Sequence, residues 1–354
     1  MLLSLTRLRS DVPDGSEGEP PAGGDLGARR SPFRKVGWRF KLAAVAVGLL
    51  LLLGPRPRVE NRWVEPQIGP DVAAWLAREE FGVPDLKPGE AKSVLWIDAA
   101  VRDRTPISLV YLHGFSGDKH ELEPVVSDLA RQIGANAYFV RLTGHAQNGE
   151  ALAEATTDDW LADAAEAVAV GRRIGERVVV IGTSTGGTLA LWAAARPESA
   201  GRIDAMVLIS PNVGLRDSRS EILLWPWGGL IARLLEGRER CFEPVNETQA
   251  RHWTTCYPTR ALVPMMATVD LVRSLDPSAV RVPTLVYYSP SDEVVDPAAI
   301  ERLIATLGER GSLRQQVNDS GDPAHHILAG DILSPGTTDR IREEIAEFLR
   351  AAVR

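Results

Sequence analysis

The serine at position 184 stands in a pattern that would make it a nucleophile. Residues 182–187 read GTSTGG, which fits the pattern G-x-S-x-G, and they lie between the apolar run RVVVI and the helix-like run TLALW. In such a strand-to-helix turn the two flanking glycines are needed because a Cβ has no room, and the turn lifts the serine hydroxyl above the sheet. The alternative is a glycine-rich turn that only packs the helix against the sheet. A serine hydroxyl near pH 7 also needs a neighbouring base, itself oriented by a carboxylate.

Alternating strand-like and helix-like segments begin at residue 107 and would position this serine. Strands are predicted at 107–112 (ISLVYL), 137–142 (AYFVRL), 177–182 (RVVVIG), 205–210 (AMVLIS), 284–289 (TLVYYS) and 313–317 (LRQQV). Four helices are predicted, at 121–133, at 157–174, directly after the serine turn, and at 341–351. Thr157-Asp158-Asp159 would form the N-terminal cap of the second helix. Such alternation predicts an α/β fold with a mostly parallel sheet that carries helices on both faces.

Composition and pattern divide the chain into four parts. Residues 1–35 are rich in Pro, Gly and charge and are predicted to be disordered, and residues 36–55 are the apolar segment. Residues 56–92 are predicted to be a linker and N-terminal extension, followed by the α/β domain at 93–354. Within the domain, residues 213–276 interrupt the alternation for longer than a normal connection, which predicts a helical insertion over one end of the sheet.

Five short motifs follow one another in a familiar order. They are HGFSG (113–117), TGH (143–145), GTSTGG (182–187), PSDEVVDP (290–297) and HHIL (325–328). Over residues 93–354 the chain resembles the α/β-hydrolase fold. It is most similar to the branch of carboxylesterases, monoacylglycerol lipases and lysophospholipases, which is often grouped with serine aminopeptidase-like hydrolases. The resemblance implies a serine hydrolase and is weak in the insertion.

The resemblance implies the chain order serine, acid, histidine for a catalytic triad. Asp292 occupies the place of the family acid, and Asp296 is the alternative, although an Asp-Pro pair more often caps the next helix. Asn212 stands where some relatives keep the acid, and an amide cannot serve. Of the six histidines only His325 and His326 follow the last strand. His326 fits the family register, a histidine followed by two apolar residues, and His325 is the alternative.

The resemblance also implies an oxyanion hole made of backbone N–H groups. The donors would be Thr185, which follows the nucleophile, and Phe115 of the HGFSG motif, where Gly114 allows close approach. His113 is predicted to be a structural hydrogen-bonding residue rather than a catalyst. His145 in the TGH turn is predicted to be structural or part of the pocket rim.

The expected reaction is hydrolysis of a carboxylic ester through an acyl-enzyme on Ser184, with a monoacylglycerol, a lysolipid or a similar ester as substrate. The cluster at 223–227 (LLWPW) would line an apolar acyl pocket through Leu224, Trp225 and Trp227, or would merely hold the insertion onto the body. Two alternatives stay open on the same fold. One is an aminopeptidase-like serine peptidase, for which acidic side chains of the insertion would bind a substrate amine. The other is a catalytically inactive binding module.

Charge is unevenly distributed along the chain. Residues 1–62 carry 11 basic and 6 acidic side chains, whereas the rest carries 29 and 41. A strongly acidic body is a poor binder of phosphate backbones, so nucleic acid is not expected as a partner. No nucleotide loop or cluster of metal-ligand spacing is visible in the sequence, and no cofactor or metal is predicted.

The apolar run at 42–55 follows six basic residues between Arg29 and Lys41. With Arg39 and Lys41 snorkelling, residues 36–54 would be just long enough to cross a bilayer, and the basic flank predicts a cytoplasmic N-terminus and an extracytoplasmic body. A cleaved secretory signal and a buried core helix are the alternatives. In an oxidising compartment Cys241 and Cys256, both in the insertion, would form a disulfide, and in a reducing one they would be unrelated apolar residues.

Overall fold

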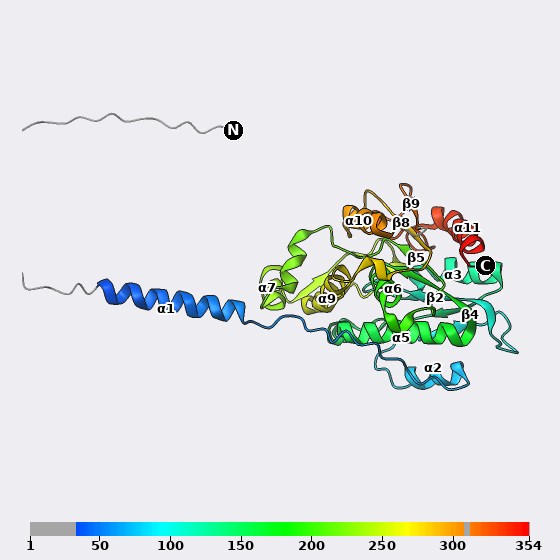
Figure 1. The fold of residues 1–354 in the computed structure, drawn as a ribbon, viewed down its shortest axis with the longest axis horizontal. Coiled ribbons are helices and arrows are strands. Elements are labelled where there is room, and N and C mark those ends of the chain that lie inside the picture. Colours follow the sequence, from blue (N-terminus) through cyan, green and yellow to red (C-terminus); the bar gives the residue numbers. More distant parts are fainter. Residues whose placement is uncertain (1–32, 308–311, 354) are drawn as a thin grey trace, which may run out of the picture. The chain divides into compact units, whose positions relative to one another are not determined.

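A computed structural model describes residues 33–307 and 312–353 (Figure 1). The predicted disordered segment 1–35 therefore lies almost wholly outside the described residues. The chain divides into two units, Met1–Leu50 and Leu51–Arg354, and the second holds the α/β fold. The four-part division predicted from the sequence stays a prediction.

The centre of the second unit is a seven-stranded sheet in the order β1-β3-β2-β4-β5-β8-β9. Only β1 runs antiparallel, and the other neighbouring pairs are parallel. The strands are β1 (Ser93–Leu95), β2 (Thr105–Leu112), β3 (Asn136–Phe139), β4 (Gly175–Thr183), β5 (Ala205–Ile209), β8 (Thr284–Tyr288) and β9 (Leu313–Gln316). The predicted mostly parallel α/β sheet is thus confirmed, and the six predicted strands are all present. The short edge strand β1 is additional.

Two helical layers cover the sheet, and side-chain alternation along the strands assigns each layer its own core. Val178 and Val180 of β4 pack with α5 (Thr157–Ile174) and α6 (Thr185–Ala195). Val179 and Ile181 point the other way and pack with α3 (Glu123–Ile133) and α11 (Pro335–Ala352). Since both faces of the sheet are buried at its centre, β4, β5 and β8 are largely apolar, which is the pattern that identified them in the sequence.

Helix α5 begins at Thr157, and its N-cap lies one residue before the predicted cap. Thr156 is the N-cap, and its hydroxyl accepts the N–H of Asp159 while the Asp159 carboxylate accepts the N–H of Thr156. This reciprocal pair is a capping box, which satisfies two N–H groups that the helix itself cannot use. The remaining helices and turns of the body are α2 (Val72–Glu80), η1 (Lys119–Glu121), α4 (Gly149–Glu154), η2 (Pro197–Ser199), η5 (Pro277–Ala279) and α10 (Pro297–Leu307).

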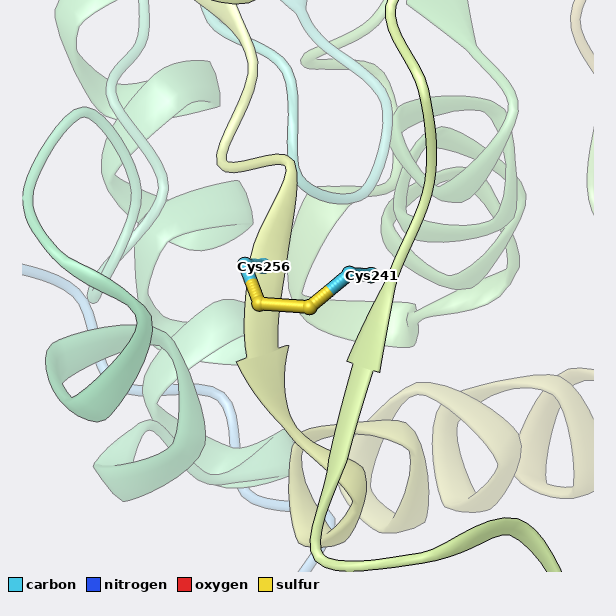
Figure 2. The surroundings of a disulfide bond; sticks show 2 residues. All are labelled: Cys241 and Cys256. Carbon is cyan, nitrogen blue, oxygen red and sulfur yellow. A yellow bond between two sulfur atoms is a disulfide. The ribbon is translucent and has the colours of Figure 1, made fainter.

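The insertion is more varied than the predicted helical segment. It contains η3 (Ser218–Leu224), α7 (Gly228–Glu236), β6 (Glu239–Cys241), α8 (Glu247–His252), β7 (Cys256–Pro258), η4 (Thr259–Ala261) and α9 (Leu262–Arg273). Strands β6 and β7 pair as an antiparallel hairpin in which Cys241 lies opposite Cys256. A disulfide joins these two residues, as expected for the oxidising alternative (Figure 2).

The insertion starts and ends its excursion at one point. Asn212 follows β5, and its side-chain amide contacts the Met265 sulfur near the start of α9 at 3.2 Å. Helix α9 then packs against α6 on its way to β8. The part between Asn212 and Met265 therefore begins and ends at one place, close to the carboxyl end of β5.

The apolar segment near the N-terminus forms the helix α1 (Phe33–Leu52). Within the described part of the chain, no helix has the combination of length and apolarity that a membrane crossing requires. The membrane part of the prediction for residues 36–55 is therefore not supported.

Candidate active site

Ser184 lies in the turn between β4 and α6 in a strained backbone conformation. Its φ is 50° and its ψ is −115°, values that a residue with a side chain seldom adopts. The turn is held open because the Ser184 N–H donates to the Ile209 carbonyl at 2.9 Å. A Cβ on Gly186 would collide with the Leu112 carbonyl oxygen, and one on Gly182 would come within 2.5 Å of the Gly186 oxygen. The two glycines are thus required where the pattern predicted them.

Asp292 and His326 are brought together from two loops at the carboxyl edge of the sheet. Asp292 follows β8, His326 follows β9, and the His326 Nδ1 lies 2.9 Å from the Asp292 Oδ2. The Asp292 carboxylate is fully buried, and its Oδ1 accepts the N–H groups of Val294 and Val295 at 2.8 and 2.9 Å. Nδ1 therefore carries the proton that it donates to Asp292, and Nε2 is left free to act as a base.

The backbone around His326 is fixed by two side chains. The Asp322 carboxylate accepts the N–H groups of His326 and Ile327 at 3.0 and 2.8 Å, and the Ser210 hydroxyl donates to the His326 carbonyl at 2.7 Å. Burial alone would lower the pKa of His326, but attraction to the Asp292 carboxylate and the hydrogen bond with it give a net rise. Asp322 and Ser210 were not identified from the sequence, since nothing in a loop sequence says which neighbour supports the histidine.

The two alternative residues lie apart from this pair. The Asp296 Oδ1 accepts the N–H of Ala298 at 3.0 Å, so this carboxylate caps the start of α10. The His325 Nδ1 lies 3.4 Å from the Ser320 hydroxyl. Asn212, at the place where some relatives keep the acid, contacts Met265 instead. The pairing geometry therefore favours Asp292 and His326 over Asp296 and His325.

Ser184 and His326 do not form a hydrogen bond with each other in the described part of the chain. Ser184 is nevertheless close to the HGFSG loop, because a Cβ on Gly114 would lie 3.3 Å from the Ser184 Cβ. The N–H groups of Phe115 and Thr185 donate to no acceptor among the described backbone hydrogen bonds. Two unused N–H groups beside a serine are the donors that an oxyanion requires. The catalytic roles of these residues stay a prediction.

His113 stabilises the HGFSG loop through two hydrogen bonds of its ring. Its Nε2 accepts the Leu142 N–H at 3.1 Å, so Nδ1 carries the proton and donates to the Gly114 carbonyl at 2.9 Å. The ring is fully buried, and burial lowers its pKa. A neutral ring with both nitrogens engaged fits the structural role predicted for His113. The His145 ring packs against it at a centroid distance of 4.9 Å.

Glu121 is a buried carboxyl under the same loop that the sequence analysis did not identify. Its Oε2 accepts the Gly114 N–H at 2.8 Å and the Tyr111 hydroxyl at 2.9 Å. Burial raises the pKa of Glu121 to about 7, although both hydrogen bonds oppose the rise. Because the residue falls in a segment with ordinary helical spacing, no signal in the sequence distinguishes it from a surface glutamate.

The three residues predicted to form an acyl pocket are close together in the sequence but have different surroundings. Leu224 lines a cavity of about 260 Å³ together with Val59 and Leu271, whereas the Trp225 side chain is 58% exposed. The backbone N–H of Trp227 donates to the Pro55 carbonyl at 2.9 Å. None of the three is placed against Ser184 by these contacts, and their substrate role stays a prediction.

Phe115, whose backbone N–H is a candidate oxyanion donor, has its ring among other aromatic side chains. Phe115 makes edge-to-face contacts with Trp160 of α5 and with Tyr257 of the insertion, at centroid distances of 6.1 and 5.3 Å. The loop, the body and the insertion therefore meet at the Phe115 ring.

Three known proteins resemble the chain. A thermostable monoacylglycerol lipase from Bacillus sp. (strain H-257) is 26% identical over 243 residues, which cover 68% of this chain and 91% of that protein. A structure described under LipS and LipT, two metagenome-derived lipolytic enzymes, aligns with a TM-score of 0.59 at 20% identity over 75% of this chain and 99% of its own. A soluble variant of monoglyceride lipase from Saccharomyces cerevisiae, in complex with a substrate analog, aligns with a TM-score of 0.55 at 12% identity over 75% and 92%.

The two structures confirm the α/β-hydrolase fold that the motifs implied. The sequence profile of the family described as serine aminopeptidase, S33 (Hydrolase_4) matches residues 105–320. This match runs from β2 past β9, covers more than half of the chain and includes Ser184 and Asp292. The chain belongs to the serine aminopeptidase S33 family.

Proposed function

We propose that the protein is a serine ester hydrolase that cleaves a monoacylglycerol, a lysolipid or a similar acyl ester through an acyl-enzyme. One observation carries the proposal, namely a serine in a strained elbow at the sheet edge where a buried Asp292–His326 pair also stands. Membership in a hydrolase family and the likeness to monoacylglycerol lipases support it.

The chemistry follows from the proton positions. The His326 Nε2 takes the proton of the Ser184 hydroxyl while Oγ attacks the ester carbonyl carbon, and the negative charge on the carbonyl oxygen is held by the N–H groups of Phe115 and Thr185. Collapse of this intermediate breaks the bond to the alcohol oxygen, which receives the proton from Nε2. Water then repeats the sequence on the acyl-enzyme and releases the acid. Throughout, Asp292 keeps the ring oriented and stabilises its positive charge.

A fluorophosphonate probe tests the nucleophile, since it labels only an activated serine. Wild-type protein should be labelled at Ser184, and Ser184→Ala should lose the label and reduce ester hydrolysis by several orders of magnitude while the fold is retained. His326→Ala should reduce hydrolysis nearly as much, and its matched control His325→Ala far less. A protein that hydrolyses esters normally after Ser184→Ala, or that loses activity with His325→Ala and not with His326→Ala, would contradict the assignment.

The acyl preference is tested with p-nitrophenyl esters of two to sixteen carbons, in parallel with aminoacyl anilides. An ester hydrolase should cleave the esters and leave the anilides, with a chain-length optimum set by the aromatic side chains around Phe115. The family also carries the name of a peptidase, and preferential cleavage of the anilides would favour that alternative. Failure to react with either substrate or with the probe would indicate an inactive binding module.

We further propose that the basic and apolar N-terminal segment directs the body to the extracytoplasmic side, as an anchor or as a cleaved signal. Support comes from the basic residues that precede the apolar run and from the disulfide, which persists in an oxidising compartment. Protease added to cells with a permeable outer layer should degrade the body. A body that is protected until the inner membrane is lysed would contradict the proposal.

A further inference from the structure

Four side chains with metal-ligand chemistry meet beside the HGFSG loop. They are Glu90, Asp118, His120 and His252, and one potential ligand atom from each lies within 4.8 Å of the others. They come from three separate segments, namely the chain before β1, the turn after the loop, and the end of α8 in the insertion. The cluster thus lies on the seam between body and insertion.

Both imidazole nitrogens lie close to both carboxylates. The His120 Nδ1 lies 3.0 Å from Glu90 and 3.4 Å from Asp118. The His252 Nδ1 lies 3.1 Å from Asp118 and 3.4 Å from Glu90. Four nitrogen and oxygen ligands at about 2.0–2.1 Å from a tetrahedral Zn²⁺ are about 3.3–3.4 Å apart. The four measured separations involve both oxygens of each carboxylate, and one ligand atom from each residue lies within 4.8 Å of the others, so a small shift of the side chains brings four ligand atoms to these spacings.

Charge and burial favour the same interpretation. Glu90 and Asp118 are 5% and 1% exposed, so two carboxylates are held together away from water. A divalent cation with two carboxylates and two neutral imidazoles makes a site of zero net charge. The imidazole rings of His120 and His252 stack with their centroids 4.2 Å apart, so both rings lie on the same side of the two carboxylates.

Further contacts around the cluster fix its members in place. The Asp118 Oδ1 accepts the backbone N–H of His120 at 2.9 Å, and the Glu123 carboxylate lies 3.8 Å from the ring nitrogen Nε2 of His120.

We propose that Glu90, Asp118, His120 and His252 form a binding site for a divalent transition metal, with Zn²⁺ as the ion that fits best. Two imidazole nitrogens and two carboxylates suit Zn²⁺, which takes four ligands, whereas Ca²⁺ takes six to eight oxygen ligands. The ion would fasten the insertion to the loop that carries Phe115. Next to the cluster, the Thr254 N–H already donates to the Ser116 carbonyl at 2.7 Å, and the ion would reinforce this contact.

The site is tested by metal binding on the full chain without a histidine tag, so the result does not depend on ester hydrolysis. After treatment with EDTA and dialysis, Zn²⁺ is titrated calorimetrically with Ca²⁺ as the control ion. We expect one Zn²⁺ per chain, no binding of Ca²⁺, and a melting temperature that rises by several degrees in excess Zn²⁺. Co²⁺ in place of Zn²⁺ should give the strong visible absorption of a tetrahedral nitrogen–oxygen site.

Variants locate the ion. His252→Gln and Asp118→Asn should each weaken Zn²⁺ binding at least about 100-fold, while the matched control His325→Gln should bind as the wild type does. Stoichiometric binding that survives both ligand variants would overturn the proposal, as would a wild-type protein that takes up neither Zn²⁺ nor Co²⁺. In the latter case the four residues are an ion-pair network. If a variant does not fold, the Co²⁺ spectrum of the wild-type protein alone decides between tetrahedral binding and none.

Discussion

Replacement of Asp292 by asparagine should stop catalysis by reversing one hydrogen bond. The Asp292 Oδ1 accepts two N–H groups, from Val294 and Val295. In Asp292→Asn the amide oxygen must therefore occupy that position, which turns the NH₂ group toward the His326 Nδ1. Two donors cannot face each other, so Nδ1 gives up its proton and accepts instead. The proton of the neutral ring then sits on Nε2, where it blocks uptake of the Ser184 proton.

The size of the effect follows from the loss of the base. The same reversal in a serine protease triad lowers kcat about 10⁴-fold. At about 1.4 kcal/mol for each factor of ten, this is about 5.5 kcal/mol of lost transition-state stabilisation. The fold should survive, because the amide oxygen preserves both backbone hydrogen bonds and the change in volume is small.

The assay is kcat/KM on the preferred p-nitrophenyl ester, with a denaturant titration on the same samples. The matched control is Asp296→Asn, four residues away, which removes a carboxylate at the start of α10 and should change kcat/KM by no more than a few-fold. An Asp292→Asn enzyme within tenfold of the wild type, with the control behaving as expected, would show that the proton position at His326 does not govern the reaction. Equal losses in both variants would mean that a general effect on the loop had been measured.

Three further predictions concern pH, the elbow and the disulfide. Since the pKa of His326 is raised and the base must be neutral, kcat/KM should increase with pH through a midpoint above 6.5, and a midpoint at or below 6.5 would contradict the pairing with Asp292. Gly186→Ala places a Cβ against the Leu112 carbonyl oxygen, so it should abolish activity and lower the free energy of unfolding, measured in denaturant titrations, by about 1–3 kcal/mol. The control Gly336→Ala, whose Cβ would meet nothing within 4 Å, should have a free energy of unfolding within about 1 kcal/mol of the wild type. Replacement of both Cys241 and Cys256 by serine should destabilise the insertion by about 3 kcal/mol in thermal unfolding. If mass spectrometry finds two alkylated thiols in the non-reduced wild-type protein, no bridge exists.

The sheet could be predicted because both of its faces are buried. The predicted strand at 177–182 contains the uninterrupted apolar run Val178–Ile181, and it lies within β4. The elbow was predictable for a related reason, since the close approach of Leu112 to Gly186 excludes any other residue and leaves a fixed pattern in the sequence. The edge strand β1 was missed because three half-buried residues carry no periodic signal.

Contacts between distant segments could not be predicted. Nothing near Glu121 in the sequence indicates that its carboxyl supports Gly114, and the support of His326 by Ser210 spans 116 positions. The four residues of the proposed metal site come from three segments, so no spacing rule finds them, and the sequence analysis accordingly predicted no metal. The insertion was predicted to be helical because short strands such as β6, exposed along its length, lack the apolar pattern of a core strand.

The contact between Asn212 and Met265 has a consequence for how this protein diversifies. A segment whose two ends meet at one point can be replaced by another of different length without changing the register of any strand, so recombination or design can exchange it as a module. Its replacement would alter the walls around the acyl group while Ser184, Asp292 and His326 stay on the retained scaffold. His252 is the proposed metal ligand that lies in the insertion. An exchanged segment without a counterpart of His252 would therefore lose the proposed metal between body and insertion at the same time as it changes the specificity.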